Sequence, residues 1–218
     1  MASLILIPWS ETEWSPAGRI ISRTSVPLTK VGREQSASWG TSMVPLGVNT
    51  VYSGEEQSGG ETARLIAERC GARHKIEKSL AEVDAGLWTG LTFDELKRRD
   101  PKVFKRWCED PTSVCPPEGE DLVKASERLR GSLAAVAKKH GDRNVVVVIG
   151  PVAFGVTRCV IESVALGKVR SMMQNEPVTY EIRADGKAKA LVTCPRAPDE
   201  DESDPEGTEC CRERDRGG

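Results

Sequence analysis

The chain has 218 residues, of which 38% are hydrophobic, and its formal net charge is −2 at pH 7. This length allows one substantial buried core, so we expect one domain followed by a tail. The near-neutral charge argues against nucleic acid as the main partner, and the lack of any apolar run near 18 residues argues against a membrane span.

The predicted elements alternate between strands and helices along the chain, which favours an α/β domain with a largely parallel sheet. Continuous apolar runs at Ser3–Ile7 and Val145–Ile149 are typical of parallel strands that are covered on both faces. Asn49–Ser53 and His74–Lys78 are weaker strand candidates. Helical patterns cover Lys30–Trp39, Gly60–Cys70, Phe93–Arg99, Glu120–Lys139 and Val152–Ala165. A β-hairpin of Thr179–Ile182 and Ala188–Thr193 is expected to turn at Asp185-Gly186.

The composition changes at about Pro195, which divides the chain into a domain over 1–194 and a charged tail over 195–218. Residues 199–209 carry seven acidic side chains and almost nothing apolar. Such a segment buries too little surface to offset its ordering entropy, so we expect disorder. An acidic interaction tail is the functional alternative.

The seven cysteines are odd in number and scattered. A secreted disulfide scaffold is usually shorter and evenly paired, so reduced thiols in the cytoplasm are expected, and the N-terminus does not resemble a signal peptide. Cys210 and Cys211 lack spaced metal-ligand partners. With no metal-ligand cluster and no Gly-rich nucleotide loop in the sequence, no cofactor is predicted.

The first 35 residues carry the most informative pattern. After the first strand come Pro8-Trp9-Ser10-Glu11-Thr12-Glu13-Trp14, Gly18-Arg19, Pro27-Leu28-Thr29, Gly32 and Gln35. This layout resembles the opening of the histidine phosphatase superfamily, in its phosphoglycerate-mutase-like branch. Members begin with a strand, Arg-His-Gly-Glu-Thr, Trp-Asn, Gly-Arg, Pro-Leu-Thr and Gly-x-x-Gln. In the family that His is the phosphoryl-accepting nucleophile, but here Arg-His-Gly reads Pro8-Trp9-Ser10.

Later family motifs follow in the same order over about residues 3–165. In the second motif Thr62-Ala63 keep the register, and the phosphate-binding Arg falls on Ser58. The third is matched by Leu80-Ala81-Glu82 and by Trp88–Thr92, so the Glu that serves many members as general acid is retained as Glu82. Pro117-Glu118-Gly119-Glu120-Asp121 is similar to the family's Pro-x-Gly-Glu-Ser. The last motif, Ser-His-Gly, aligns with Ile149-Gly150-Pro151 and loses its His to Gly150.

The resemblance implies a three-layer, phosphoglycerate-mutase-like fold with a mostly parallel central sheet flanked by helices. It also implies that four replacements fall in one site, at Pro8, Trp9, Ser58 and Gly150. Phosphoryl transfer needs an in-line nucleophile and fixed positive charge, and Arg grips phosphate best. With both groups missing and Glu82 left behind, we expect the family's phosphohistidine chemistry to be absent.

Two classes of function follow. The favoured one is a pseudophosphatase that serves as a binding or regulatory module for a protein partner or an unphosphorylated small ligand, with a homo-oligomer left open. The alternative is a phosphomonoester hydrolase that uses non-standard residues around Glu82. We further hypothesise that Trp9 fills the space left by the small Gly150 and Ser58, because packed interiors tolerate few voids. Otherwise Trp9 covers the mouth of a residual cleft.

Other residues are given structural interpretations. His74 and His140, the two histidines of the chain, are predicted to be solvated surface residues. Ser10, Thr12 and Cys159 lack a nearby His base, and Cys159 is expected to be a buried structural thiol. The basic run Lys97–Arg106 is interpreted as a solvated helix face broken at Pro101, rather than as an anion-binding surface. Trp88 and Trp107 are interpreted as core or interface packing, rather than as a ligand cage.

Overall fold

The computed structural model describes residues 2–141, 143–173, 177–182 and 188–193. Its sheet has six strands in the order β3-β2-β4-β1-β5-β6. The strands are β1 (Ala2–Pro8), β2 (Thr50–Ser53), β3 (Arg73–Ile76), β4 (Val145–Ile149), β5 (Val178–Ile182) and β6 (Ala188–Thr193). The first four pair in parallel, whereas β5 and β6 join antiparallel at one edge. The predicted α/β fold with a mostly parallel sheet is confirmed.

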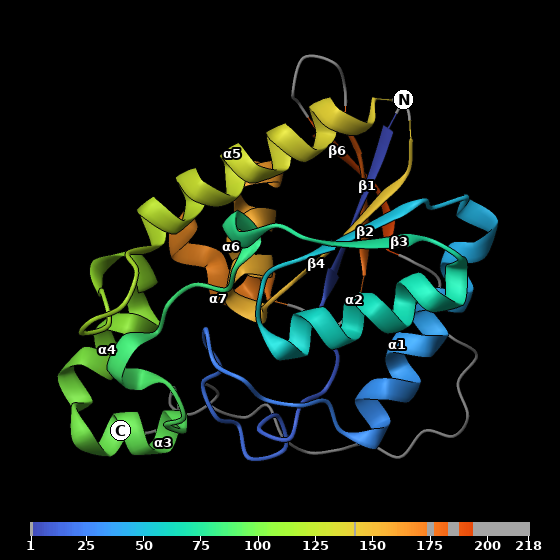
Figure 1. The fold of residues 1–218 in the computed structure, drawn as a ribbon. Coiled ribbons are helices and arrows are strands. Elements are labelled where there is room, and N and C mark those ends of the chain that lie inside the picture. The colour runs from blue at the N-terminus through green and yellow to red at the C-terminus, as the bar shows by residue number, and fades with distance from the viewer. Residues whose placement is uncertain (1, 142, 174–176, 183–187, 194–218) are drawn as a thin grey trace, which may run out of the picture.

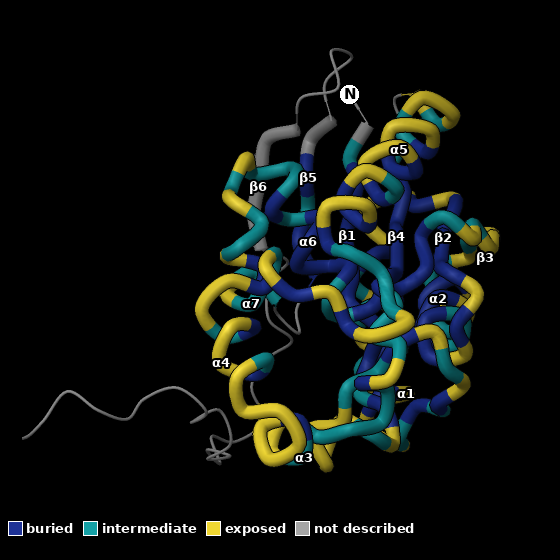
Figure 2. The backbone as a smooth tube through the Cα atoms, turned by 90° about the vertical axis from the view of Figure 1, so that its left-hand side faces the viewer, coloured by how far each residue is buried: buried dark blue, intermediate teal, exposed yellow. Residues whose placement is uncertain are grey.

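Helices cover both faces of this sheet and form the three layers (Figure 1). On one face lie α1 (Lys30–Met43) and α2 (Gln57–Cys70), and on the other lie α5 (Leu122–His140) and α6 (Pro151–Glu162). In β1, Ile5 and Ile7 pack with the α1/α2 core, and Leu4 and Leu6 pack with the opposite core. Successive strand side chains point to opposite faces, so only a continuous apolar run supplies both cores. Figure 2 shows β1, β2 and β4 buried between the helical layers.

Capping side chains set the starts of several helices. Thr29 caps α1 by accepting from Gly32 N, and Asp121 caps α5 by accepting from Val123 N and Lys124 N. The basic run predicted to break at Pro101 does so: α3 (Phe93–Arg99) ends, and α4 (Pro101–Glu109) starts at that proline. Proline suits this first helical position because its missing N–H needs no partner there.

Some predicted bounds were wrong, for local reasons. The helix expected to end at Trp39 continues to Met43, because Gly40 lets α1 approach α2 closely: an added Cβ would lie 2.6 Å from Arg69 Cβ. The strand expected at His74–Lys78 lies at Arg73–Ile76, since Glu77 caps a 3₁₀ turn by accepting from Ser79 N.

Other helix bounds also differ from the prediction. The helix expected over Gly60–Cys70 begins at Gln57, and the one expected over Val152–Ala165 spans Pro151–Glu162. The helix expected to start at Glu120 begins at Leu122, after its cap. The short helix α7 (Val169–Met172) was not predicted. The predicted turn at Asp185-Gly186 and the tail over 195–218 lie outside the described residues. None of the described helices is long and apolar enough to cross a bilayer.

Candidate functional site

The loops after β1 and β4 meet at one edge of the sheet, where the carboxyl ends of parallel strands commonly form sites. Pro8 pairs with Ile149, and the Trp9 backbone N–H donates to the Ile149 carbonyl at 3.0 Å. The structure therefore brings Pro8, Trp9 and Gly150 together, as expected of the corresponding family motifs.

The Trp9 side chain lies in the interior of this edge, with only 6% of its surface exposed. It packs in the α1/α2 core with Ile7 and Val148. A Cβ atom added at Gly150 would lie 2.8 Å from Trp9 Cη2, and one added at Gly59 would lie 3.5 Å from Cε3. The indole thus fills space beside two glycines that begin or precede helices, and it does not cover a cleft from outside.

Ser58 takes a different position from the one the space-filling hypothesis assigned to it. Its side chain is fully buried, and its hydroxyl donates to the Val26 carbonyl at 2.6 Å. The neighbouring Gly59 is the residue whose missing side chain faces the indole. Sequence reasoning missed Gly59 because the family motif draws attention to the Arg position next to it.

Gly150 has no room for a side chain. A Cβ added there would overlap with Glu82 Oε2, besides lying 2.8 Å from the Trp9 ring. Approaches under 3.0 Å are tolerated only if a neighbour shifts, and both neighbours here are buried. A histidine at position 150 is therefore incompatible with the present positions of Trp9 and Glu82.

Glu82 is fully buried and accepts hydrogen bonds from backbone N–H groups only. Its Oε1 accepts from Val83 N at 2.6 Å and from Ala153 N at 2.7 Å, and its Oε2 accepts from Val152 N at 2.9 Å. Val152 and Ala153 belong to the first turn of α6, whose cap residue Gly150 has no side chain. Free N–H groups at a helix N-terminus attract anions. Here the chain's own carboxylate occupies them.

Burial raises the pKa of Glu82 to about 7, although the hydrogen bonds from Val83, Ala153 and Val152 oppose the shift. The nearby Glu56 carboxylate also raises it. Glu56 is 6% exposed, and its Oε1 accepts from the Glu82 backbone N–H at 2.7 Å. The site thus keeps two buried carboxyl groups, a charge pattern opposite to the one that would attract phosphate.

The hydroxyl and thiol groups once considered as substitute nucleophiles are all engaged or buried. Ser10 Oγ is 2.7 Å from Ser36 Oγ, and Thr12 Oγ1 is 2.9 Å from Ser15 Oγ. Cys159 is 1% exposed, as predicted, and burial raises the pKa of its thiol. Among the described residues, none of these groups is hydrogen-bonded to a His base, so the geometry offers no activated nucleophile.

The two histidines were wrongly predicted to be solvated. Both are partly buried and bonded to hydroxyl groups of β2: His140 Nε2 is 2.8 Å from Tyr52 Oη, and His74 Nε2 is 2.9 Å from Ser53 Oγ. The reason is that Tyr52 and Ser53 lie on a buried strand, where polar atoms need partners. Burial lowers the pKa of both imidazoles, which favours their neutral forms.

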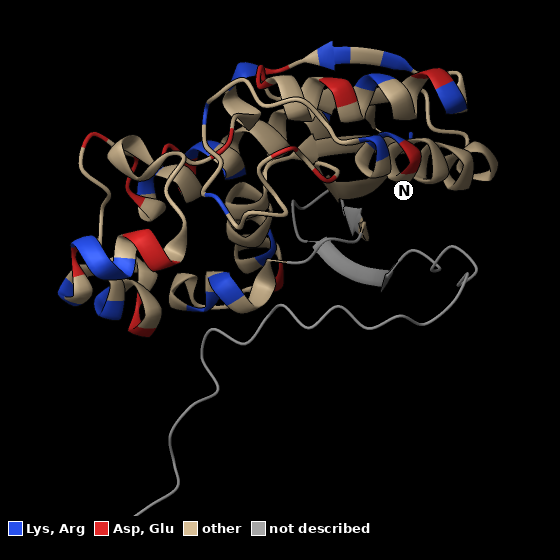
Figure 3. Ribbon diagram, turned by 90° about the horizontal axis from the view of Figure 1, so that it is seen from below, with Lys and Arg blue, Asp and Glu red and all other residues tan. Residues whose placement is uncertain are grey.

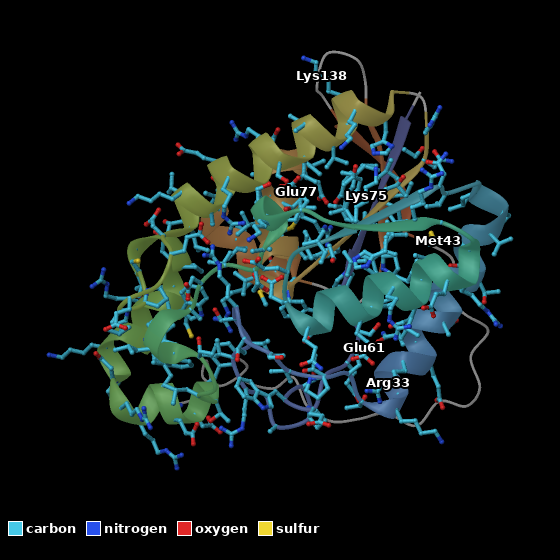
Figure 4. The ribbon with its side chains drawn as sticks, in the orientation of Figure 1. Arg33, Met43, Glu61, Lys75, Glu77 and Lys138 are labelled. Carbon is cyan, nitrogen blue, oxygen red and sulfur yellow. The ribbon has the colours of Figure 1, made fainter. Side chains whose placement is uncertain are left out.

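Retained motif residues hold the loop that follows β1. The Thr29 hydroxyl donates to Glu11 Oε1 at 2.6 Å, and a Cβ at Gly32 would overlap with the Glu11 carbonyl. Arg33 on α1 and Glu61 on α2 point toward one another (Figure 4), with Nε 2.6 Å from Oε1. These contacts fix the loop after β1 against the first turns of α1 and α2.

Two arginines that sequence reasoning missed support the segment before Glu82. Arg128 donates to both carboxylate oxygens of Glu120 at 2.8 and 2.7 Å, and to the Ser79 and Ala81 carbonyls. Arg23 donates to the Glu82 carbonyl at 3.2 Å and to Glu120 at 3.0 Å. The Pro-x-Gly-Glu motif that contains Glu120 was the available signal, since a Glu in a loop commonly has an Arg partner.

The basic run was predicted to be a solvated helix face. Its cations Lys97, Arg98, Arg99, Lys102, Lys105 and Arg106 are all exposed on α3 and α4. Acidic residues lie among them, including Glu109, whose carboxylate is 3.7 Å from Lys105 Nζ. Figure 3 shows Lys and Arg close to Asp and Glu on the outer helices, which is typical of a solvated surface.

Comparisons with known proteins agree with this fold. The chain is 31% identical over 198 residues to phosphoserine phosphatase 1 of Hydrogenobacter thermophilus, covering 89% of this chain and 94% of that protein. It is 27% identical to a metal-independent phosphoserine phosphatase of Arabidopsis thaliana, covering 80% and 75%. The structure of Bacillus stearothermophilus YhfR superposes with a TM-score of 0.82 at 22% identity, covering 88% and 96%. Residues 4–195 match the histidine phosphatase superfamily (branch 1), so the chain belongs to that family.

Proposed function

We propose that this chain is a non-catalytic member of the family, a pseudophosphatase that acts as a binding or regulatory module. The observation that carries the proposal is the packing of the Trp9 indole beside Gly150, at the two positions that align with the family's histidines. A nucleophile is missing at position 9, and position 150 leaves no room for one.

The electrostatics of the site support the same proposal. A transferring phosphoryl group needs preorganised donors and positive charge around its oxygens. The α6 N–H groups that would serve this purpose donate to Glu82 instead. Phosphate bound there would displace a buried carboxylate and lie beside Glu56, and both groups oppose an added negative charge.

The direct test is turnover. Pure protein is incubated with p-nitrophenyl phosphate and with phosphoserine, and released phosphate is measured alongside a Glu82→Gln variant. We expect wild type and variant to match the buffer control, and we expect no phosphohistidine by mass spectrometry. Release by wild type that disappears in Glu82→Gln would contradict the proposal.

A second test rebuilds the family site with Pro8→Arg, Trp9→His, Ser10→Gly, Ser58→Arg and Gly150→His. The two histidine substitutions need to be combined, because a side chain at position 150 meets the Trp9 ring. The matched control carries Trp9→Asn in place of Trp9→His and keeps the other four substitutions, so that it lacks only the nucleophile at position 9. Phosphatase activity in the five-residue variant alone would show that the scaffold is competent and that these replacements account for its inactivity.

The alternative function is a phosphomonoester hydrolase with non-standard residues. Two observations favour it: the names of the curated relatives, which include phosphoserine phosphatases, and the Glu82 pKa of about 7, which suits general acid–base catalysis. The burial of Glu82 argues against this alternative, because its carboxylate is inaccessible and accepts hydrogen bonds from backbone N–H groups. The turnover test separates the two candidates.

The proposed role requires a protein partner or an unphosphorylated ligand, and we place the protein in a reducing compartment such as the cytoplasm. Cys70, Cys115 and Cys159 form no disulfide with the other described residues, which suits such a compartment. No cofactor is needed for binding of this kind.

A further inference from the structure

A cavity of about 180 Å³ adjoins the far side of the Glu82 segment. Val83 and Val152 line it, and the backbone N–H groups of the same two residues donate to the Glu82 carboxylate. The cavity is therefore a direct neighbour of the Trp9 site but is not filled by the indole. Its size is below the roughly 300–1,000 Å³ of drug-sized pockets, so it suits a small ligand.

Aromatic side chains dominate the walls of the cavity. Trp88 and Trp107 meet edge to face, with ring centroids 5.7 Å apart and an interplanar angle of 86°. Both belong to the core, as predicted from the sequence, yet both also line this cavity. Phe93 lines it too and is 39% exposed, which connects the cavity to solvent. Such walls favour a flat ring, because aromatic pairs gain from stacked or edge contacts.

Trp107 also carries an unused hydrogen-bond donor. Its side chain is 9% exposed, and its Nε1 has no hydrogen-bond partner among the described residues. Buried donors are normally paired, so each exception requires an explanation. Because Nε1 is itself inaccessible to a solvent-sized atom, this donor lies within the cavity wall, and a molecule in the cavity meets the ring of Trp107 and not its N–H.

The charged groups at the cavity differ in how they are neutralised. Glu120 is paired with Arg128 at 2.7 Å and with Arg23 at 3.0 Å, and Asp84 lies 4.0 Å from Arg23. Arg170, the cation among the lining residues, forms no ion pair within the part of the chain that the structure describes. Besides its apolar walls, the cavity thus offers one cation whose charge no other described residue pairs with.

We propose that this cavity binds a small aromatic carboxylate, with its ring against Trp88 and Trp107 and its carboxylate facing Arg170. The inference rests on the proposed function, because it names the class of unphosphorylated ligand that the module would bind. A single carboxylate matches the guanidinium of Arg170, which forms no ion pair with the other described residues. A phosphomonoester would bring a second negative charge next to Asp84 and Glu120.

The probe for the test is 1-naphthoate, titrated into the full-length protein by calorimetry. We expect saturable 1:1 binding. Arg170→Gln should weaken it at least about tenfold, because a charge-assisted hydrogen bond is lost. Arg130→Gln, which removes an exposed cation on α5, is the matched control and should leave the affinity unchanged. Trp107→Phe leaves a smaller ring in the wall and should weaken binding several-fold, because part of the aromatic contact is lost.

Two analogues sharpen the test. Neutral 1-naphthalenemethanol should bind more weakly than 1-naphthoate, and 1-naphthyl phosphate should bind no more tightly. Absence of saturable binding, equal affinity in Arg170→Gln, or tighter binding of the phosphate would each overturn the inference. Released phosphate is measured on the same preparation: turnover contradicts the proposed function, whereas failed binding without turnover removes only the proposed ligand.

Discussion

The two sides of the Glu82 segment differ in how their space is used. On one side, the Trp9 indole packs between Gly150 and Gly59 and is only 6% exposed. On the other side, Val83 and Val152 line a cavity that remains open past Phe93. A closed interior and an open pocket thus share one buried carboxylate and the first turn of α6.

Different elements support the two sides, which explains why one can change without the other. The closed side depends on β1 and on the first turns of α2 and α6, where glycines make room for the indole. The open side depends on α4, on α7 and on the Arg128–Glu120 pair at the start of α5. A filled interior on one side therefore does not require collapse of the neighbouring cavity. Substitutions should affect the two sides separately.

The largest expected effect comes from emptying the closed side. Trp9→Ala should lower the free energy of unfolding by about 3–5 kcal/mol, because a buried indole is removed from between rigid neighbours. The measurement is urea denaturation followed by far-UV circular dichroism. Binding of 1-naphthoate, measured in the same variant, tells whether the open side persists.

Two controls accompany Trp9→Ala. Trp9→Phe keeps part of the packing and should cost clearly less. Leu87→Ala removes a side chain that is 60% exposed, and should change the stability by no more than about 0.5 kcal/mol. A loss below about 1 kcal/mol in Trp9→Ala would mean that the indole does not stabilise this site, and the contrast between the two sides would fail.

The second effect is a pH dependence that belongs to the shared carboxylate. The native pKa of Glu82 is about 7, above its ordinary value of 4.5, so the native state holds the proton more tightly than the unfolded chain. Its contribution to stability is fully present below about pH 4.5, declines as the pH rises through about 7, and is then lost. The expected total is about 3 kcal/mol.

The pH dependence is measured as the difference between the unfolding free energies of wild type and Glu82→Gln from pH 4 to 8.5. Taking the difference removes the contribution of His74 and His140, whose pKa values are lowered and whose effect has the opposite sign. A difference that stays flat across this range would show that burial does not raise the pKa of Glu82, and the shared carboxylate would then be fully ionised at pH 7.

The sequence predicts the closed side better than the open one. Apolar runs and motif order were sufficient to predict that the segments at Trp9, Glu82 and Gly150 would meet, because parallel strands align their carboxyl ends. They did not reveal that Glu82 accepts hydrogen bonds from the α6 backbone. The cap residue of α6 has no side chain, and nothing in the sequence indicates that a carboxylate distant along the chain takes its place.

The cavity and the histidines were missed for a related reason. Whether Trp107 faces only the core or also a cavity depends on how closely α4 and α5 pack. The residue types in the sequence do not determine that spacing. His74 and His140 look like surface residues among charged neighbours in sequence, but β2 places hydroxyl groups beside them. These hydrogen-bond partners depend on which strands are neighbours in the sheet, and that arrangement is seen only in the structure.

The third expected effect tests why Gly150 has to be small. Gly150→Ala should cost about 1–3 kcal/mol, because its Cβ would meet Trp9 and Glu82, which are both buried. The measurement is again urea denaturation. Combining it with Trp9→Phe should cost less than the sum of the single changes, since neighbouring substitutions that share a void are not additive. Strict additivity would indicate that the indole and Gly150 do not interact.

The smallest effect has the opposite sign and separates packing from backbone propensity. Gly131 lies inside α5, is exposed, and a Cβ added there would meet nothing within 4 Å. Gly131→Ala should therefore raise the free energy of unfolding by about 0.5–1 kcal/mol, because alanine reduces the entropy of the unfolded chain and favours helix. If both glycine variants destabilise the protein equally, then the loss of stability at Gly150 is the general cost of adding a methyl group to a glycine. If their signs differ, the cost is specific to the space that Trp9 and Glu82 already occupy.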